Sequence, residues 1–318
     1  SVTVTFSEVV NKTGTPQLTL AVGSDNRTAM YASGTGNAPL VFTYTIQTGD
    51  TDTDGISIRA NALALNSGTI RDAAGNNATL TNNAVSGNAS YKVDTTAPTA
   101  NYPVATDDVG TVRGALDNGS TTDDTDLVLS GTNESGSIVK VYNSTTELDN
   151  ATVSGTSWSY TATLANVTTY DFNVRETDLA GNTSAATSDF TVTVNTTAPT
   201  ISSIVISSAT GIQNNLLNVG DNVSVTATFS ESVIVDNASG APTLTLVVGD
   251  DNQTATYRSG SGGTTLVFQY TIQAGETDSN GISMRADVLA LNSGTIKDTT
   301  GNNATLTHSA LTDNASYK

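Results

Sequence analysis

Hydrophobic and polar side chains alternate along most of the chain. Every second residue is apolar in WSYTATL (158–164), and Leu, Phe, Tyr and Ile hold alternate positions of LVFQYTI (266–272). Successive side chains of a β-strand point to opposite faces, so this alternation predicts strands with one buried face. Turn segments rich in Gly, Asn and Asp separate the strands, and no segment has a convincing helical period. About seven such strands in about 100 residues are typical of a β-sandwich.

Two copies of one repeat frame a different unit. Residues 1–92 recur at 224–318, where SVTVTFSE (1–8) matches SVTATFSE (224–231). The unit between them is bracketed by VDTTAPT (93–99) and VNTTAPT (194–200), and X-Pro segments of this kind are extended, as a linker requires. We therefore predict three tandem sandwich domains in an extended array. They are the first repeat at 1–93, a spacer at 94–197 and the second repeat at 198–318.

The second repeat has a leading segment that the first lacks. Residues 198–223 include ISSIVISS (201–208) and have no counterpart before Ser1. We expect the first domain to lack its N-terminal strand. Two explanations stay open: the chain is a window of a longer array, or a neighbouring chain donates the strand.

Composition narrows the possible functions. The 318 residues include 12 basic and 30 acidic side chains, for a net charge of −18, with no Cys and one His. The lack of Cys excludes disulfides and thiolate chemistry, and the acidity argues against binding nucleic acid. No apolar run is long enough for a membrane span. Because no nucleophile motif or spaced catalytic triad is present, we expect no enzymatic activity. We expect Trp158 in the spacer core and His308 on the surface.

The spacer carries a set of motifs that together indicate a family. They are DDVG (107–110), LDNGSTTDDTD (116–126), LSGTNESGSIVKVY (129–142) and ETDLAGNTS (176–184), between the two TTAPT brackets. This unit resembles the bacterial Ig-like repeats of giant RTX-type surface adhesins, and the flanking repeats resemble the partner domain that alternates with them. The resemblance implies Ig-like sandwiches strung into an extracellular stalk at the cell surface. It also implies that Ca²⁺ stiffens the loops and the domain junctions.

Acidic residues concentrate in the spacer. It holds fourteen acidic and three basic residues, a net charge of −11, against −1 for residues 1–93 and −6 for residues 198–318. Calcium takes six to eight oxygen ligands, so such loops suit it. In a sandwich with its termini at opposite ends, one loop set lies near each linker. The candidate ligands are Asp94, Glu134, Asp178 and Asn182 at the first linker, and Asp107, Asp108, Asp123 and Asp124 at the second, where Asn195 replaces Asp. The alternative is that these residues only cap solvated turns.

Two further motifs leave the same choice open. D-x-x-G-N begins at Asp72, Asp178 and Asp298, where either a metal or a tight hairpin loop explains it. The run Asp50, Asp52, Asp54 has the first half of an EF-hand spacing, and its counterpart includes Asp278. No flanking helices accompany the run, so we expect either a β-loop calcium site or a polar hairpin tip.

Sixteen Asn-x-Ser/Thr triplets occur in the chain. Composition and copying of the repeat account for the triplets if the host lacks N-glycosylation, and the alternative is a surface stalk that carries N-linked glycans. The leading functional hypothesis is a non-enzymatic extender segment of a large extracellular adhesin, rigidified by Ca²⁺, whose partners are the adjacent Ig-like domains. The alternative is a subunit of an N-glycosylated filament or surface layer, in which copies of the chain assemble by strand donation.

Overall fold

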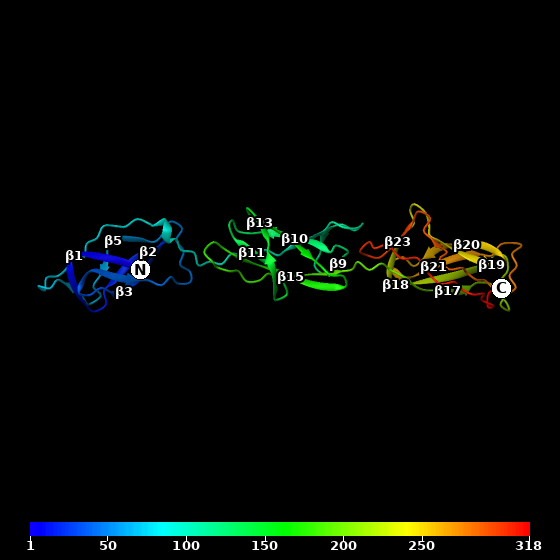
Figure 1. Cartoon of the computed structure of the whole chain (residues 1–318), viewed down its shortest axis with the longest axis horizontal. Coiled ribbons are helices and arrows are strands. Elements are labelled where there is room, and N and C mark those ends of the chain that lie inside the picture. The colour runs from blue at the N-terminus through cyan, green and yellow to red at the C-terminus, as the bar shows by residue number, and fades with distance from the viewer.

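The computed structural model describes residues 1–318 as three bodies in a row, joined end to end by the two TTAPT linkers (Figure 1). Almost all regular structure is β-strand, and the one helical element is a single 3₁₀ turn, Ala89–Tyr91. This confirms the all-β prediction. None of the helical structure is long and apolar enough to cross a membrane.

The first repeat is built on a six-stranded sheet in the order β5-β2-β3-β4-β1-β6. Its long strand β1 pairs with β4 over Val2–Val10 and then with β6 over Asn11–Thr13. Isolated bridges such as Asp52↔Val93 join irregular segments of residues 50–93, which contribute Val93 to the core. The strands are β1 (Val2–Thr13), β2 (Gln17–Val22), β3 (Asp25–Ser33), β4 (Asn37–Thr43), β5 (Ser57–Ala64) and β6 (Thr69–Arg71).

The spacer is a sandwich of two five-stranded sheets, β13-β14-β10-β7-β8 and β12-β11-β15-β16-β9. Apolar residues of both sheets meet in one core, in which Trp158 from β14 is buried as expected. The strands are β7 (Val104–Asp107), β8 (Gly114–Leu116), β9 (Ser120–Thr122), β10 (Asp126–Thr132), β11 (Ile138–Asn143), β12 (Thr146–Asn150), β13 (Thr152–Ser154), β14 (Ser157–Thr163), β15 (Thr168–Thr177) and β16 (Phe190–Val194).

The second repeat has the sheet of the first with one strand added. Its order is β17-β18-β21-β20-β19-β22, with β23 paired to β18, so β18 corresponds to β1 and β17 has no counterpart. The strands are β17 (Ile201–Ala209), β18 (Asn222–Asp236), β19 (Thr243–Val248), β20 (Asp251–Ser259), β21 (Gly263–Thr271), β22 (Leu289–Ala290) and β23 (Thr295–Lys297).

The extra strand changes how completely the core is buried. The core cluster of the second repeat holds 18 buried residues, including Ile206 of β17, and that of the first repeat holds 11. Val225 and Ala227 of β18 are fully buried, whereas the corresponding Val2 and Val4 of β1 are only half-buried. The first repeat therefore presents one side of its core to solvent.

Gly131 in the spacer provides a test of core packing. It lies opposite Trp158 in the β10–β14 register, and a Cβ added to it would lie 2.8–2.9 Å from atoms of the indole ring. Gly131→Ala therefore forces the ring to move, and overpacking of this kind costs about 1–3 kcal/mol. We expect a lower melting temperature and a red-shifted emission from the chain's single tryptophan. Ser159→Ala, at the exposed neighbour of Trp158, is the control and should leave both unchanged.

Candidate metal sites and domain junctions

The first linker is hydrogen-bonded to the bodies on both of its sides. The Thr95 hydroxyl donates to the carbonyl oxygen of Asp50 (3.0 Å) and accepts from the N–H of Gly49 (2.9 Å), both in the first repeat. On the other side, the Asn182 side-chain amide of the spacer donates to the Asp94 carbonyl oxygen (3.2 Å). Asn182 and Asp94, which are predicted neighbours at this linker, therefore do lie together.

The second linker is held in the same way. The Asn302 side-chain amide donates to the carbonyl oxygen of Asn195 at 2.9 Å, as Asn182 does to Asp94. On the spacer side, Asn166 accepts from the N–H of Thr196 and donates to the hydroxyl of Thr197. The asparagine that ends each D-x-x-G-N motif thus binds the carbonyl of the preceding linker at both junctions.

The D-x-x-G-N motif folds into a loop closed on its own aspartate. In the second repeat, Asp298 Oδ1 accepts the N–H groups of Thr300, Gly301 and Asn302, and Oδ2 accepts from the Asn302 amide. Gly301 has φ +103°, a conformation that favours glycine. These contacts explain the turn without a metal.

The same loop occurs in the other two bodies. The Asn76 and Asn182 amides donate to Asp72 and Asp178, respectively, at 2.7 and 2.8 Å. These side-chain hydrogen bonds, with backbone N–H groups, hold the pKa values of both aspartates below their usual range. The Asn76 amide of the first repeat makes this bond without a linker carbonyl beside it.

The carboxylates of the EF-hand-like run accept hydrogen bonds from different protein groups. The N–H of Gln47, the Tyr44 hydroxyl and the Arg27 guanidinium all bind Asp50, and they lower its pKa to about 2. Arg27 is peculiar to the first repeat, because Gln253 holds its place in the second.

The two aspartates that follow do not join Asp50. Asp52 accepts N–H groups of Gly23, Asp54 and Gly55, and Asp278 does the same with Gly249, Asn280 and Gly281. Asp54 is exposed. The structure does not bring the three carboxylates of this run to a common point, and nowhere do three His, Cys, Asp or Glu side chains converge as a ready-made metal cluster.

The second junction holds several buried carboxylates without a cationic partner. Asp107 and Asp124 of the spacer and Asp298 of the second repeat are each at most 4% exposed. None of the three ion pairs of the chain involves them. Asp107 accepts from the Thr122 hydroxyl and the N–H of Val109, while Asp298 also accepts from the Asn195 amide (3.3 Å).

Asp123 lies among these groups with one oxygen unsatisfied. Its Oδ1 is buried and has no hydrogen-bond partner. Burial raises the pKa of Asp123, and the negative charges of Asp107 and Asp298 raise it further. Since Asp298 belongs to the next body, the charge repulsion acts across the junction. Asp108, the fourth spacer candidate here, is exposed, but its N–H faces Asp124 Oδ2 at 3.4 Å.

The orphaned oxygen of Asp123 beside buried carboxylates has the chemistry that a hard cation such as Ca²⁺ requires. Because no three of these carboxylates converge here, a cation would have to draw them together. The donors at hand are Asp107, Asp123, Asp124 and Asp298, with Asn195 between the bodies. The first junction fits less well, because Asp94 and Glu134 are exposed and no carboxylate there has a buried oxygen without a hydrogen-bond partner.

One buried carboxylate near the first junction is not among the predicted ligands. Glu176 is 2% exposed and accepts from the Ser137 hydroxyl (2.6 Å) and the N–H of Glu134 (2.5 Å). Glu176 lies two residues before Asp178, near the end of β15. Side chains two residues apart in a strand share a face, so the E-T-D spacing is the sequence signal that could have identified it.

The structure also limits which sequons can carry glycans. Asn133 is buried, and its side-chain amide donates to the Glu134 carbonyl and the Ser137 hydroxyl. The amides of Asn182 and Asn195 bind the junctions. A glycan at any of these three would displace a structural hydrogen bond.

Paired substitutions test the linker contact. Asn302→Ala removes the bond to the Asn195 carbonyl together with the bond inside the loop, whereas Asn76→Ala removes only the loop bond. Each lost hydrogen bond costs about 0.5–1.5 kcal/mol. Small-angle scattering should show a shorter, broader distance distribution for Asn302→Ala and an unchanged one for Asn76→Ala. Equal profiles for the two variants would contradict a linker role for the asparagine.

Asp123 should make stability depend on pH in a defined direction. Because its pKa is raised in the folded chain, the folded state binds this proton more tightly than the unfolded state does. Its contribution to stability is thus present below the ordinary carboxyl pKa and is lost as pH rises through the raised value. In calcium-free buffer at pH 7, Asp123→Asn should melt at a higher temperature than the parent chain. Thermal melts from pH 3 to 7 should show the advantage shrinking as pH falls.

Comparison with known proteins gives distant structural likenesses and no matching family. No protein family and no curated protein matches the sequence. One structural likeness is to the fibronectin(III)-like modules of Clostridium thermocellum CbhA, with 14% identity and a TM-score of 0.26 over 60% of this chain and 86% of that one. Another is to Bacteroides ovatus SGBP-B of the mixed-linkage glucan utilization locus, in complex with a mixed-linkage heptasaccharide. It has 16% identity and a TM-score of 0.20, over 68% of this chain and about half (48%) of that one. Both likenesses are weak, and the structure itself shows tandem, sandwich-like β domains.

Proposed function

We propose that the chain is a non-enzymatic extender segment of a large extracellular surface protein, which holds other domains away from the surface. The observation that carries this proposal is the end-to-end arrangement, in which each linker is hydrogen-bonded to the body before it and the body after it. The resemblance of the spacer to adhesin repeats supports the location at the cell surface.

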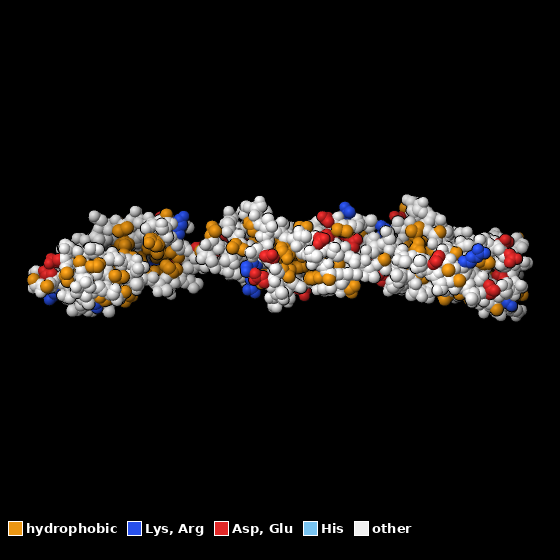
Figure 2. Space-filling view, viewed as in Figure 1, with side chains coloured by type: hydrophobic (Ala, Val, Ile, Leu, Met, Phe, Trp, Pro, Cys, Tyr) orange, Lys and Arg blue, Asp and Glu red, His pale blue; other side chains and the backbone are white.

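Two-sided anchoring is what an extender requires. A free linker of several residues lets neighbouring domains reorient, which is the usual expectation for tandem domains. Here, Pro98 and Pro199 restrict the linkers further, and carbonyls that would otherwise bind water are bound by asparagine side chains. Figure 2 shows the resulting rod, and the face in view is mostly uncharged with scattered acidic and basic groups.

We further propose that Ca²⁺ stiffens the second junction. Asp107, Asp123, Asp124 and Asp298 would supply the ligand oxygens, with the Asn195 side chain between the two bodies. The cation would neutralise carboxylates that otherwise repel one another across the junction. The first junction, with Asp94, Glu134, Asp178, Asn182 and Glu176, offers a weaker location of the same kind.

Calcium titration tests this proposal. A ligand that binds only the folded state stabilises it by about 2.7 kcal/mol at 100 times its Kd. The parent chain should therefore melt higher in millimolar Ca²⁺ than in EDTA, with an unchanged or longer maximum dimension in scattering. Asp298→Asn should lose this gain. Asp72→Asn, the matched change in the first repeat, should keep it.

Two results would overturn calcium stiffening: equal melting temperatures in Ca²⁺ and EDTA, or a calcium gain of equal size in both variants. A rod that bends freely under both conditions would overturn the extender proposal itself.

A further inference from the structure

The first repeat has an open side that the second repeat fills with a segment of its own. In the second repeat, β18 pairs with β21 on one edge and with β17 on the other. In the first repeat, β1 pairs with β4 on the corresponding edge, and no strand lies along the outer edge of Val2–Phe6. Exposed edges of this kind readily add a further strand.

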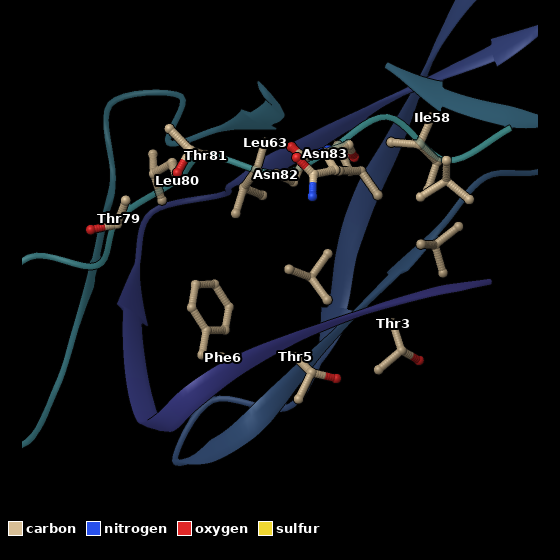
Figure 3. Close-up of a pocket in the computed structure, with 14 residues that line it drawn as sticks. Thr3, Thr5, Phe6, Ile58, Leu63, Thr79, Leu80, Thr81, Asn82 and Asn83 are labelled. Carbon is tan, nitrogen blue, oxygen red and sulfur yellow. Dashed lines mark hydrogen bonds between the residues drawn. The ribbon is translucent and has the colours of Figure 1, made fainter. Parts of the chain in front are cut away.

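The open side is lined by core residues. One cavity of about 270 Å³ lies between β1 and residues 79–85, and a second of about 360 Å³ adjoins it. In Figure 3, Phe6 points across the first cavity toward Leu63 and Leu80, while Thr3 and Thr5 lie on the other side of β1. We call this surface the acceptor groove; its apolar lining includes Val2, Val4, Phe6, Ile58, Leu80 and Val85.

The same positions are closed in the second repeat. Phe229 and Met284, which correspond to Phe6 and Ile58, are 3% and 2% exposed, whereas Phe6 and Ile58 are half-buried. Ile206 of β17 belongs to the buried core cluster of the second repeat, and Ile201 and Ile204 of the same strand pack against that cluster. Figure 2 shows hydrophobic side chains gathered on the visible surface of the first body.

At one end the groove becomes polar, and its residues there correspond to those that bind the linker in the second repeat. A cavity of about 380 Å³ lies against Ser7, Glu8, Asp72, Asn76 and Thr79. The corresponding residues of the second repeat all bind the segment that precedes β17. Ser230 exchanges hydrogen bonds with Thr200, Thr305 N–H donates to the Pro199 carbonyl, and Asn195 contacts Glu231, Asp298 and Asn302.

We propose that the acceptor groove binds an extended segment with the sequence pattern of residues 195–209, a linker followed by a strand, supplied by another repeat of this kind. The strand would add antiparallel to β1 in the register of the second repeat. That register places Ile201, Ile204 and Ile206 opposite Phe6, Val4 and Val2. The pairings of Ile201 to Ile206 with β18 have equivalent, unfilled positions on β1. Glu8, Asp72 and Asn76 likewise stand where Glu231, Asp298 and Asn302 contact Asn195 in the second repeat. The proposal goes beyond the extender role and does not depend on calcium.

The test uses the full chain and a synthetic peptide of residues 195–211. The peptide should bind at one site per chain in fluorescence anisotropy, and hydrogen exchange should slow at the amides of residues 2–7. A peptide with Ile201, Ile204 and Ile206 changed to Ser should bind at least about tenfold more weakly, because burial of even one such side chain is worth that much. A control peptide with Val205→Ser should bind like the parent peptide, because Val205 is 45% exposed in β17.

The register can be tested by cross-linking, because the chain has no cysteine of its own. Val205 pairs with Thr226, whose counterpart is Thr3, and both Val205 and Thr3 face outward. A Thr3→Cys chain should form a disulfide with a Val205→Cys peptide and not with a Thr200→Cys peptide.

Three results would overturn the proposal. They are no binding of the peptide, equal binding of the parent peptide and the peptide with the three isoleucines changed, or hydrogen-exchange protection at amides outside the groove. None of these results bears on the linker contacts or on calcium.

Discussion

The hydrogen bond between an asparagine side chain and a linker carbonyl sets how one body sits on the next. The bond occurs at both junctions, from Asn182 to Asp94 and from Asn302 to Asn195. It depends on a loop that is already rigid, because the aspartate at the start of the motif binds the loop's backbone N–H groups and the asparagine amide. The loop therefore reaches the linker with its donor in place, and little conformational entropy remains to be lost when the two meet.

Repulsion between carboxylates at the second junction opposes this contact between the bodies, and a bound cation would relieve the repulsion. Asp107, Asp124 and Asp298 are buried with hydrogen bonds but without a positive partner, and Asp123 has an oxygen with no partner at all. Buried charges are costly when unpaired. The Asp50 network in the first repeat shows the contrasting case, in which Arg27, Tyr44 and a backbone N–H satisfy the carboxylate and depress its pKa.

The sequence allowed the strands, the repeats and the absent partner of β1 to be predicted, because alternation and self-similarity are local signals. Trp158 was correctly placed in a core for the same reason. Contacts between distant positions were not predictable. Glu176 looked like one more polar strand residue, and nothing in the D-x-D-x-D-G spacing indicated that Asp52 would be satisfied by the backbone N–H groups of Gly23 and Gly55. His308 was expected simply to lie on the surface. It is half-buried and accepts the N–H of Val288, as Asn82 accepts that of Ala62 in the first repeat.

Comparison of the two repeats shows which features form within one repeat and which require the preceding segment. Both build the same sheet and the same D-x-x-G-N loop, so these features do not depend on a preceding linker. What differs is burial along β1 and β18, and this difference follows the presence of residues 195–209. That segment serves two bodies at once, since its linker part closes the junction and its strand part closes the core. Burial of the core of a repeat and attachment to the preceding body therefore use one continuous segment, and a shared segment of this kind couples stability between neighbours in a quasi-one-dimensional protein.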